Sequence, residues 1–171
     1  MARNTLHVAE ATASVAISCP RDDGVAEVSA QFAKIVSTLS YYNEVARRSE
    51  VAKYSPCRLE QMIASDVGSV QIATINMQVV GFTFSNIDDG LIWLSWFGVR
   101  AEFRRRGIGT ALLSALHERA KRAGAHKIWC DCRPNNVASR TVLAGTGYRE
   151  ICTLVNHWYG QDYLLWERSV A

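Results

Sequence analysis

Several features that mark other classes of protein are missing from this 171-residue chain. It has no run of about 18 uncharged apolar residues, which excludes a membrane-spanning helix and leaves no reason to expect a membrane partner. Glu10 interrupts the apolar stretch 5–18, so we expect no export signal and a cytoplasmic protein. The four histidines and five cysteines show no metal-ligand spacing and no CxxC pair, so we expect no metal and no disulfide framework. Cys130 and Cys132 are two positions apart in a strand-like stretch, so both point to the same face. They are interpreted as neighbouring buried thiols.

What is present fits one domain over residues 1–171, of which 1–11 form a loose lead-in, because 49% of the chain is hydrophobic and 20% charged. The net charge is only +3, but residues 100–127 hold eight basic side chains against two acidic ones. We therefore expect an anionic ligand beside this segment. Arg119, Lys121 and Arg122 are interpreted separately, as the solvated face of a helix.

The spacing of apolar residues predicts an α/β fold. They recur every three or four positions over 25–53, with a break near Ser40, and Pro56 begins a further helix to about 64 with Ser55 as its cap. Later helices are expected at 107–123 and 137–144. The expected strands are 13–18, 70–75, 79–85, 91–99, 127–133, 148–155 and 163–168, with turns at 76–77 and 86–90. This order gives a mixed sheet with helices on both faces, and the strand 91–99 should be central and covered on both sides because it is apolar on both.

The segment 99–110 carries the clearest chemical signal, because arginines and glycines meet at the start of a helix. Gly107 and Gly109 allow ligand oxygens to approach the backbone, and the first-turn N–H groups of the helix have no helical partner. The helix dipole and the arginines at 104–106 add positive charge, which predicts a pyrophosphate site. A P-loop is excluded because no Gly-Lys-Ser/Thr follows, and a Rossmann fingerprint because its third glycine is absent.

A second motif follows the strand 127–133. The two motifs contain Val99, Arg104, Gly107 and Gly109, and then Asn136, Ser139, Gly147 and Tyr148. In this order and spacing they resemble the GNAT superfamily of N-acetyltransferases, which carries V-x-x-x-x-[QR]-x-x-G-x-[GA] followed by N-x-x-[AS] and G-[FY]. The resemblance covers residues 70–168 and implies a GNAT-like sheet of six or seven strands, mixed and mostly antiparallel. It also implies that the parallel strands 91–99 and 127–133 splay apart at the site.

The resemblance implies acetyl-CoA as the acetyl donor. Backbone groups of Phe97 and Val99 would bind the pantetheine amides, and the Val99 N–H would face the thioester carbonyl, where negative charge develops. Asn136 would contact the cofactor from the other side or cap its own helix, whereas Ser139 is interpreted as a helix-surface residue. The pyrophosphate would be held by the backbone of Arg104, Arg105, Arg106, Gly107, Ile108, Gly109 and Thr110.

Asp131 is the candidate general base. It lies near the carboxyl end of the strand 127–133, where open α/β sheets bind ligands. In the branch of the family that acetylates ribosomal-protein alanine, a glutamate five residues before the motif asparagine is the base, and Asp131 precedes Asn136 by five. The alternative is an ion pair between Asp131 and Arg133. The family's usual general acid, a tyrosine seven residues after the asparagine, is replaced here by Leu143, which leaves the acid unassigned.

The acceptor pocket should be built from residues 25–60 and from the loop 156–162. His157 and Tyr159 are its candidate contacts, although a turn histidine and a core tyrosine are the simpler interpretations. The implied acceptor is a primary amine, acetylated by direct transfer: a small metabolite, an amino-acid-like compound, an antibiotic or a protein N-terminus. The alternative is an acetyl-CoA-binding sensor or subunit with little catalysis. Nucleic-acid binding is disfavoured because no known binding motif is present, and the final hairpin is a candidate homodimer contact.

Overall fold

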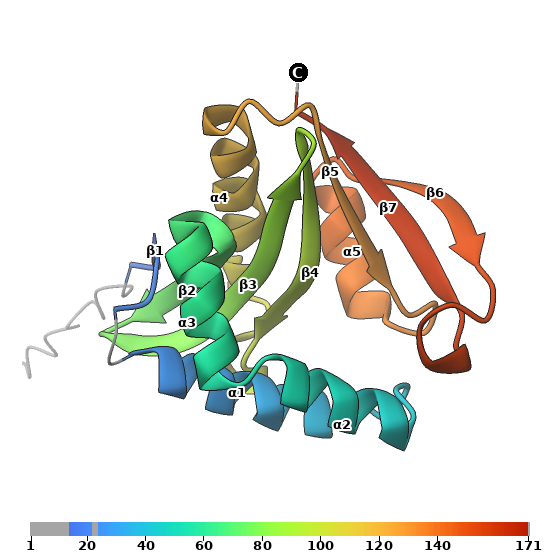
Figure 1. Ribbon diagram of the computed structural model, residues 1–171, viewed down its shortest axis with the longest axis horizontal. Helices are drawn as coiled ribbons and strands as arrows, with labels where there is room; N and C mark the ends of the chain where they lie inside the picture. The colour runs from blue at the N-terminus through green and yellow to red at the C-terminus, as the bar shows by residue number, and fades with distance from the viewer. Residues whose placement is uncertain (1–13, 22–23, 171) are drawn as a thin grey trace, which may run out of the picture.

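A seven-stranded sheet with helices on both faces forms the framework of the computed structural model, which describes residues 14–21 and 24–170 (Figure 1). The strand order is β1-β2-β3-β4-β5-β7-β6, with β4 and β5 parallel and the other neighbours antiparallel. The strands are β1 (Ala16–Ser18), β2 (Val70–Ile75), β3 (Gln78–Asp88), β4 (Leu91–Val99), β5 (Lys127–Cys132), β6 (Arg149–Leu154) and β7 (Tyr163–Ser169). The helices are α1 (Val25–Ser37), α2 (Glu44–Lys53), α3 (Pro56–Ser65), α4 (Ile108–Arg122) and α5 (Val137–Gly145).

These elements confirm the predicted α/β class and the mainly antiparallel sheet, including the break that separates α1 from α2. The expected lead-in 1–11 and the first residue of the expected strand 13–18 lie outside the described residues. Within the described ranges, no helix combines the length and the apolar character needed to cross a membrane.

The tight turns of the β2–β3 and β3–β4 hairpins consist of residues with positive φ. Asn76 and Met77 have φ values of 50° and 64°, so the predicted two-residue turn is confirmed. The predicted second turn at 86–90 is too long, because β3 continues to Asp88 and only Asp89 and Gly90, at φ 46° and 74°, make the turn. Residues 86–88 remain in the strand because they pair in register with the start of β4.

The helices cover both faces of the sheet (Figure 1). Buried apolar clusters lie between the helices and the sheet on each face. On one face, Phe32 of α1 packs edge-on against Phe82, Tyr54 and Trp96. On the other face, α4 buries a stripe at helical spacing that includes Leu112 and Leu116. β4 is therefore central as predicted, but it is not covered on both sides. Only Ile92 and Leu94, which share one face, are buried, whereas Leu91, Trp93 and residues 95–99 are half-buried.

The prediction that Arg119 belongs to a solvated helix face is wrong. Its side chain lies on the apolar stripe of α4, one turn after Leu116, and the residue is only 6% exposed. It forms an ion pair with Asp66 and donates a hydrogen bond to Ser85 Oγ at 3.1 Å. The side chain packs so closely on Gly68 that a Cβ there would clash with Arg119 Nε. Arg119 is thus a structural cation, because its charge is paired before any ligand arrives.

β4 and β5 separate halfway along β4, and this separation positions the site. The two strands pair only over residues 91–94 and 127–130. Ser95 follows as an extra residue, because the register of β3 against β4 shifts there, and such a bulge bends a strand. Beyond it β4 remains paired with β3, and β5 remains paired with β7. The expected splayed parallel pair is therefore confirmed.

Candidate active site

One wall of the gap consists of backbone groups at the end of β4. The Arg100 N–H donates to the Val80 carbonyl at 2.9 Å, and β4 pairs with β3 without interruption over residues 96–99. Backbone groups of an antiparallel strand point alternately to the two sides. The N–H groups of Phe97 and Val99 therefore point away from β3 and towards the gap. The Val99 carbonyl accepts a hydrogen bond from Arg104 Nε at 3.1 Å, which ties the next loop to this strand end.

The start of α4 continues this wall. The first helical hydrogen bond runs from the Ala111 N–H to the Gly107 carbonyl, so the N–H groups of residues 108–110 precede the helical ladder. Gly107 has φ +75°, and a Cβ there would meet nothing within 4 Å, which means that it is needed for its conformation and faces open space. Arg105 also has a positive φ, of 64°. We call the backbone of residues 97, 99 and 104–110 the backbone wall.

The arginines at 104–106 are exposed beside this helix start. The Arg106 guanidinium lies 5.3 Å from the centre of the Phe103 ring, which holds its stem near the loop. Arg100 is instead engaged by Glu102, through Nε at 3.0 Å and an ion pair at 2.5 Å. Exposed guanidinium groups and unpaired N–H groups together provide what a phosphate oxygen requires.

Asn136 lies across the gap from the backbone wall, at the start of α5. Its Oδ1 accepts a hydrogen bond from the Ser139 N–H at 3.1 Å, so it caps the helix, as one of the two interpretations expected. Both residues line the pocket, although Ser139 was expected on the helix surface alone. The cofactor contact of Asn136 stays a prediction.

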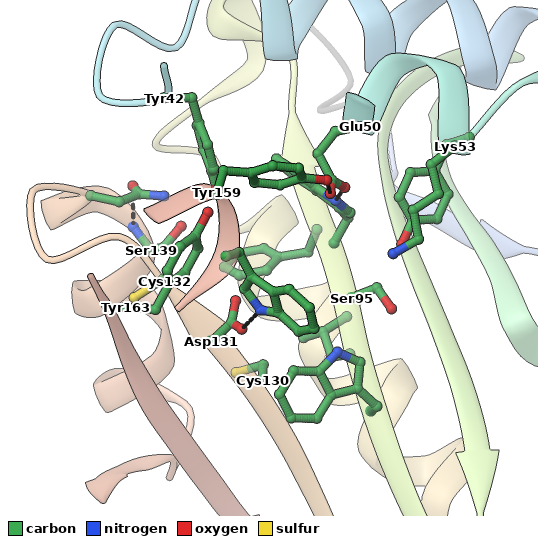
Figure 2. Close-up of a pocket in the computed structure, with 17 residues that line it drawn as sticks. Tyr42, Glu50, Lys53, Ser95, Cys130, Asp131, Cys132, Ser139, Tyr159 and Tyr163 are labelled. Atoms are coloured by element: carbon green, nitrogen blue, oxygen red, sulfur yellow. Dashed lines mark hydrogen bonds between the residues drawn. The ribbon is translucent and has the colours of Figure 1, made fainter. Parts of the chain in front are cut away.

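Asp131 lies in the pocket, on the face of β5 opposite the buried thiols of Cys130 and Cys132 (Figure 2). Burial raises the pKa of its carboxyl to about 6, although a hydrogen bond from Trp158 counteracts part of the rise. That bond joins Trp158 Nε1 to Asp131 Oδ2 at 2.8 Å. The alternative ion pair with Arg133 is not formed, because Arg133 donates to the carbonyls of Tyr41 and Asp162.

Glu50 is the charged residue of the pocket that sequence reasoning missed. It is only 8% exposed and comes from α2, a helix whose other side chains are largely polar. Its Oε2 accepts a hydrogen bond from Trp96 Nε1 at 2.6 Å, and its Oε1 accepts one from the Tyr159 hydroxyl at 2.7 Å (Figure 2). One signal was available: Glu50 follows Ala46 by one helical turn and so shares the buried face of α2.

The loop 156–162 closes the pocket with its aromatic residues. Tyr159 lines the pocket as predicted, and Trp158, which was not predicted, lines it too. The prediction for His157 is wrong, because it does not line the pocket; the centre of its ring lies 4.4 Å from that of Trp158. The loop is fixed to the segment before α2 by a hydrogen bond from Asn43 Nδ2 to the Tyr159 carbonyl at 3.0 Å. We call Glu50, Asp131, Trp158 and Tyr159 the side-chain wall.

Aromatic rings and two carboxylates dominate the lining of the pocket as a whole. The aromatic residues are Tyr42, Tyr54, Trp93, Trp96, Phe97, Trp158, Tyr159 and Tyr163. Burial raises the pKa of Tyr54 to about 12 and that of Tyr163 further, so their hydroxyls keep their protons at neutral pH. Leu143, at the position of the usual acid, is fully buried in the core and presents no polar group.

The model of the acetyltransferase (GNAT) family matches residues 37–148, which is more than half of the chain. The chain therefore belongs to the GNAT family of acetyltransferases, as its two motifs indicated, and is an acyltransferase. A search of curated protein sequences finds no significant match.

Solved structures of acetyltransferases share the fold. The PaiA N-acetyltransferase of Thermoplasma acidophilum in complex with coenzyme A superposes with a TM-score of 0.78 at 18% identity, covering 91% of this chain and 99% of that one. YncA, a putative acetyltransferase of Salmonella typhimurium with acetyl-CoA, gives 0.71 at 17%, covering 92% and 94%. The ribosomal-protein-alanine N-acetyltransferase of Brucella melitensis gives 0.72 at 20%, covering 90% and 99%.

Proposed function

We propose that the protein transfers the acetyl group of acetyl-CoA directly to a primary amine. The observation that carries the proposal is the gap between β4 and β5. Outward-facing amides of Phe97 and Val99 lie on one side of it, and Asp131 lies on the other. An acyl transfer needs these two things, a donor for the developing oxyanion and a base for the incoming amine.

The backbone wall fits the donor. Acetyl-CoA would supply the activated thioester, and two of the fold relatives hold coenzyme A or acetyl-CoA. The N–H groups at the start of α4 and the arginines at 104–106 would bind its pyrophosphate. The amides of Phe97 and Val99 would pair with the pantetheine, and the Asn136 amide group would approach it from α5. The open space at Gly107 leaves room for this ligand.

Asp131 would take the proton of the amine. An alkylammonium of pKa near about 10.4 must lose a proton before its nitrogen can attack. A carboxylate whose pKa is about 6 is ionised at neutral pH and is still a better proton acceptor than an ordinary aspartate. The hydrogen bond from Trp158 occupies Oδ2, so Oδ1 is the oxygen left to meet the amine. The Val99 N–H would stabilise the oxyanion.

Direct transfer is favoured over a mechanism with an acetyl-cysteine intermediate, because the nearby thiols are poor nucleophiles. Burial raises the pKa of Cys132 to about 11 and that of Cys130 well above its ordinary value. A thiol reacts as its thiolate, which is scarce at neutral pH when the pKa is this high.

A sensor or subunit that binds acetyl-CoA with little catalysis is the second candidate, and the buried Leu143 favours it by removing the usual acid. Thermal unfolding with acetyl-CoA, and with NAD and ATP as controls, tests the shared first step. A ligand at about 100 times its Kd adds about 2.7 kcal/mol of stability. Thiol release with a panel of amines then separates the candidates. We expect turnover whose kcat/KM rises with pH through about 6 as Asp131 ionises. Binding without turnover of any amine would instead favour the sensor.

A further inference from the structure

Glu50 is a buried carboxylate without a cation. Its two hydrogen-bond donors, Trp96 Nε1 and the Tyr159 hydroxyl, are both neutral. Across residues 14–21 and 24–170, no lysine, arginine or histidine nitrogen lies within 4.0 Å of it. Buried charges in proteins are ordinarily paired, because removing a charge from water is costly. The arrangement is that of a site whose counter-charge arrives with a ligand.

Lys53 is the residue that would be expected to supply this charge, because it follows Glu50 by three positions on α2 and lines the same pocket. Its ammonium instead lies 5.3 Å from the centre of the Tyr54 ring, and the residue is exposed. The helix thus carries a cation within reach of Glu50 but does not pair the two.

The surroundings of Glu50 suit a ligand cation. Tyr42, Tyr54, Trp96 and Tyr159 line the same pocket as Glu50, and the faces of aromatic rings attract ammonium groups. Asp131 lies in the same pocket but on β5, and Figure 2 shows the two carboxylates reaching it from different elements. The negative charge of Glu50 contributes to the raised pKa of Asp131, so the two groups sense each other electrostatically.

We propose that the acceptor is a short chain with two cationic nitrogens, one beside Asp131, where it reacts, and one held by Glu50. The proposal rests on the proposed function and names the substrate class of the same site. A monoamine satisfies one carboxylate and leaves Glu50 unpaired. A diamine satisfies both, and its unreacted ammonium stays charged while the other nitrogen loses its proton.

The first test compares acceptors on the wild-type enzyme by thiol release. α,ω-Diamines from 1,3-diaminopropane to 1,6-diaminohexane are each measured against the monoamine with the same number of carbons. We expect the best diamine to exceed its monoamine in kcat/KM by roughly 10- to 100-fold, the value of one charged hydrogen bond. The mono-N-acetylated diamine, whose second nitrogen is neutral, should react like the monoamine. This comparison requires no variant.

The second test changes Glu50. Glu50→Gln removes the charge and should reduce the preference for the diamine to about onefold, mainly by raising KM for the diamine. Glu50→Asp and Tyr159→Phe keep the charge and should retain most of the preference, although Tyr159→Phe removes a hydrogen bond. Glu44→Gln is the matched control, because Glu44 is an exposed residue of the same helix and pairs with Arg48. Thermal unfolding of each variant establishes that it is folded.

Three outcomes would overturn the inference. Equal kcat/KM for diamines and monoamines would do so and leave the proposed function intact, as would a preference that survives in Glu50→Gln. Failure of every amine while acetyl-CoA still stabilises the fold would instead reject the proposed function, and this inference with it.

Discussion

The two walls of the pocket are built in different ways. The backbone wall comes from one continuous segment, the end of β4 and the start of α4, and uses N–H groups that any residue type could present. The side-chain wall brings together Glu50 from α2, Asp131 from β5 and two aromatic residues from the loop 156–162. Its chemistry depends on residue identity and on contacts between positions up to 109 residues apart. A substitution in the backbone wall should therefore act by changing the backbone conformation. A substitution in the side-chain wall should act by removing a chemical group.

The largest effect should follow Asp131→Asn in the side-chain wall. Loss of the base should lower kcat/KM by about 10²- to 10⁴-fold at neutral pH. The pocket should keep its shape, because an asparagine oxygen can still accept the hydrogen bond from Trp158. Thiol-release kinetics measure the loss, and an unchanged thermal shift with acetyl-CoA shows that the backbone wall is intact. A kcat/KM that Asp131→Asn leaves unaltered at every pH would remove Asp131 from the mechanism.

The same substitution should raise the stability of the fold at neutral pH. The folded-state pKa of Asp131, about 6, lies above its ordinary value, so the folded protein binds this proton more tightly than the unfolded chain. Stability therefore falls as the pH rises from about 4 to 6, and the full cost remains above pH 6. Asparagine avoids that cost. We expect Asp131→Asn to gain on the order of 1–2 kcal/mol in denaturant unfolding at pH 7.5 and little at pH 3.5. An equal gain at both pH values would contradict this cause.

The backbone wall is tested by Gly107→Ala, with Gly124→Ala as a matched control. Both glycines flank α4, both have positive φ, of 75° and 68°, and a Cβ at either would meet nothing within 4 Å. Each alanine should therefore cost about 1 kcal/mol of stability through strain alone. Only Gly107→Ala should also weaken the binding of acetyl-CoA, raising its Kd by roughly fivefold to tenfold, because the substitution reorients N–H groups beside the pyrophosphate. Calorimetry measures the two Kd values. Equal values for the two variants would show that the start of α4 does not bind acetyl-CoA.

The backbone wall and the side-chain wall also differ in how much of each could be predicted from the sequence. The backbone wall was predictable because its signals are local: glycines at fixed spacing, a cluster of arginines and an amphipathic helix directly after an apolar strand. Asp131 was found through its fixed distance from Asn136. Glu50 and Trp158 were missed because their roles depend on partners from remote segments, and the bulge at Ser95 was missed because nothing in an apolar strand marks an extra residue. Arg119 was misassigned because its partner Asp66 lies 53 positions away.

A smaller effect is expected for Trp158→Phe. The indole hydrogen bond stabilises the ionised form of Asp131 and so lowers its pKa, and phenylalanine cannot donate it. The rise of kcat/KM with pH should move upward by about one pH unit, while the plateau above pH 8 stays near that of the wild type. Trp93→Phe is the control, since Trp93 lines the same pocket and makes no hydrogen bond to Asp131 among the described residues. A plateau that falls without movement of the pH profile would show that Trp158 only shapes the pocket.

The smallest effect is expected for substitution of the buried thiol of Cys132. Cys132 lines the pocket, but with a pKa of about 11 it is ionised in only about one molecule in ten thousand at pH 7. Direct transfer does not use this thiol, so Cys132→Ala should keep kcat within about threefold of the wild type, the remaining loss coming from a small cavity beside Trp166. Cys152→Ala, at an exposed position, is the control. Mass spectrometry after incubation with acetyl-CoA alone should find no acetyl group on Cys132. An acetylated Cys132 whose acetyl group is lost when amine is added, together with an inactive Cys132→Ala, would replace direct transfer by a covalent mechanism in which the thiol, rather than the amine, is the first acceptor of the acetyl group.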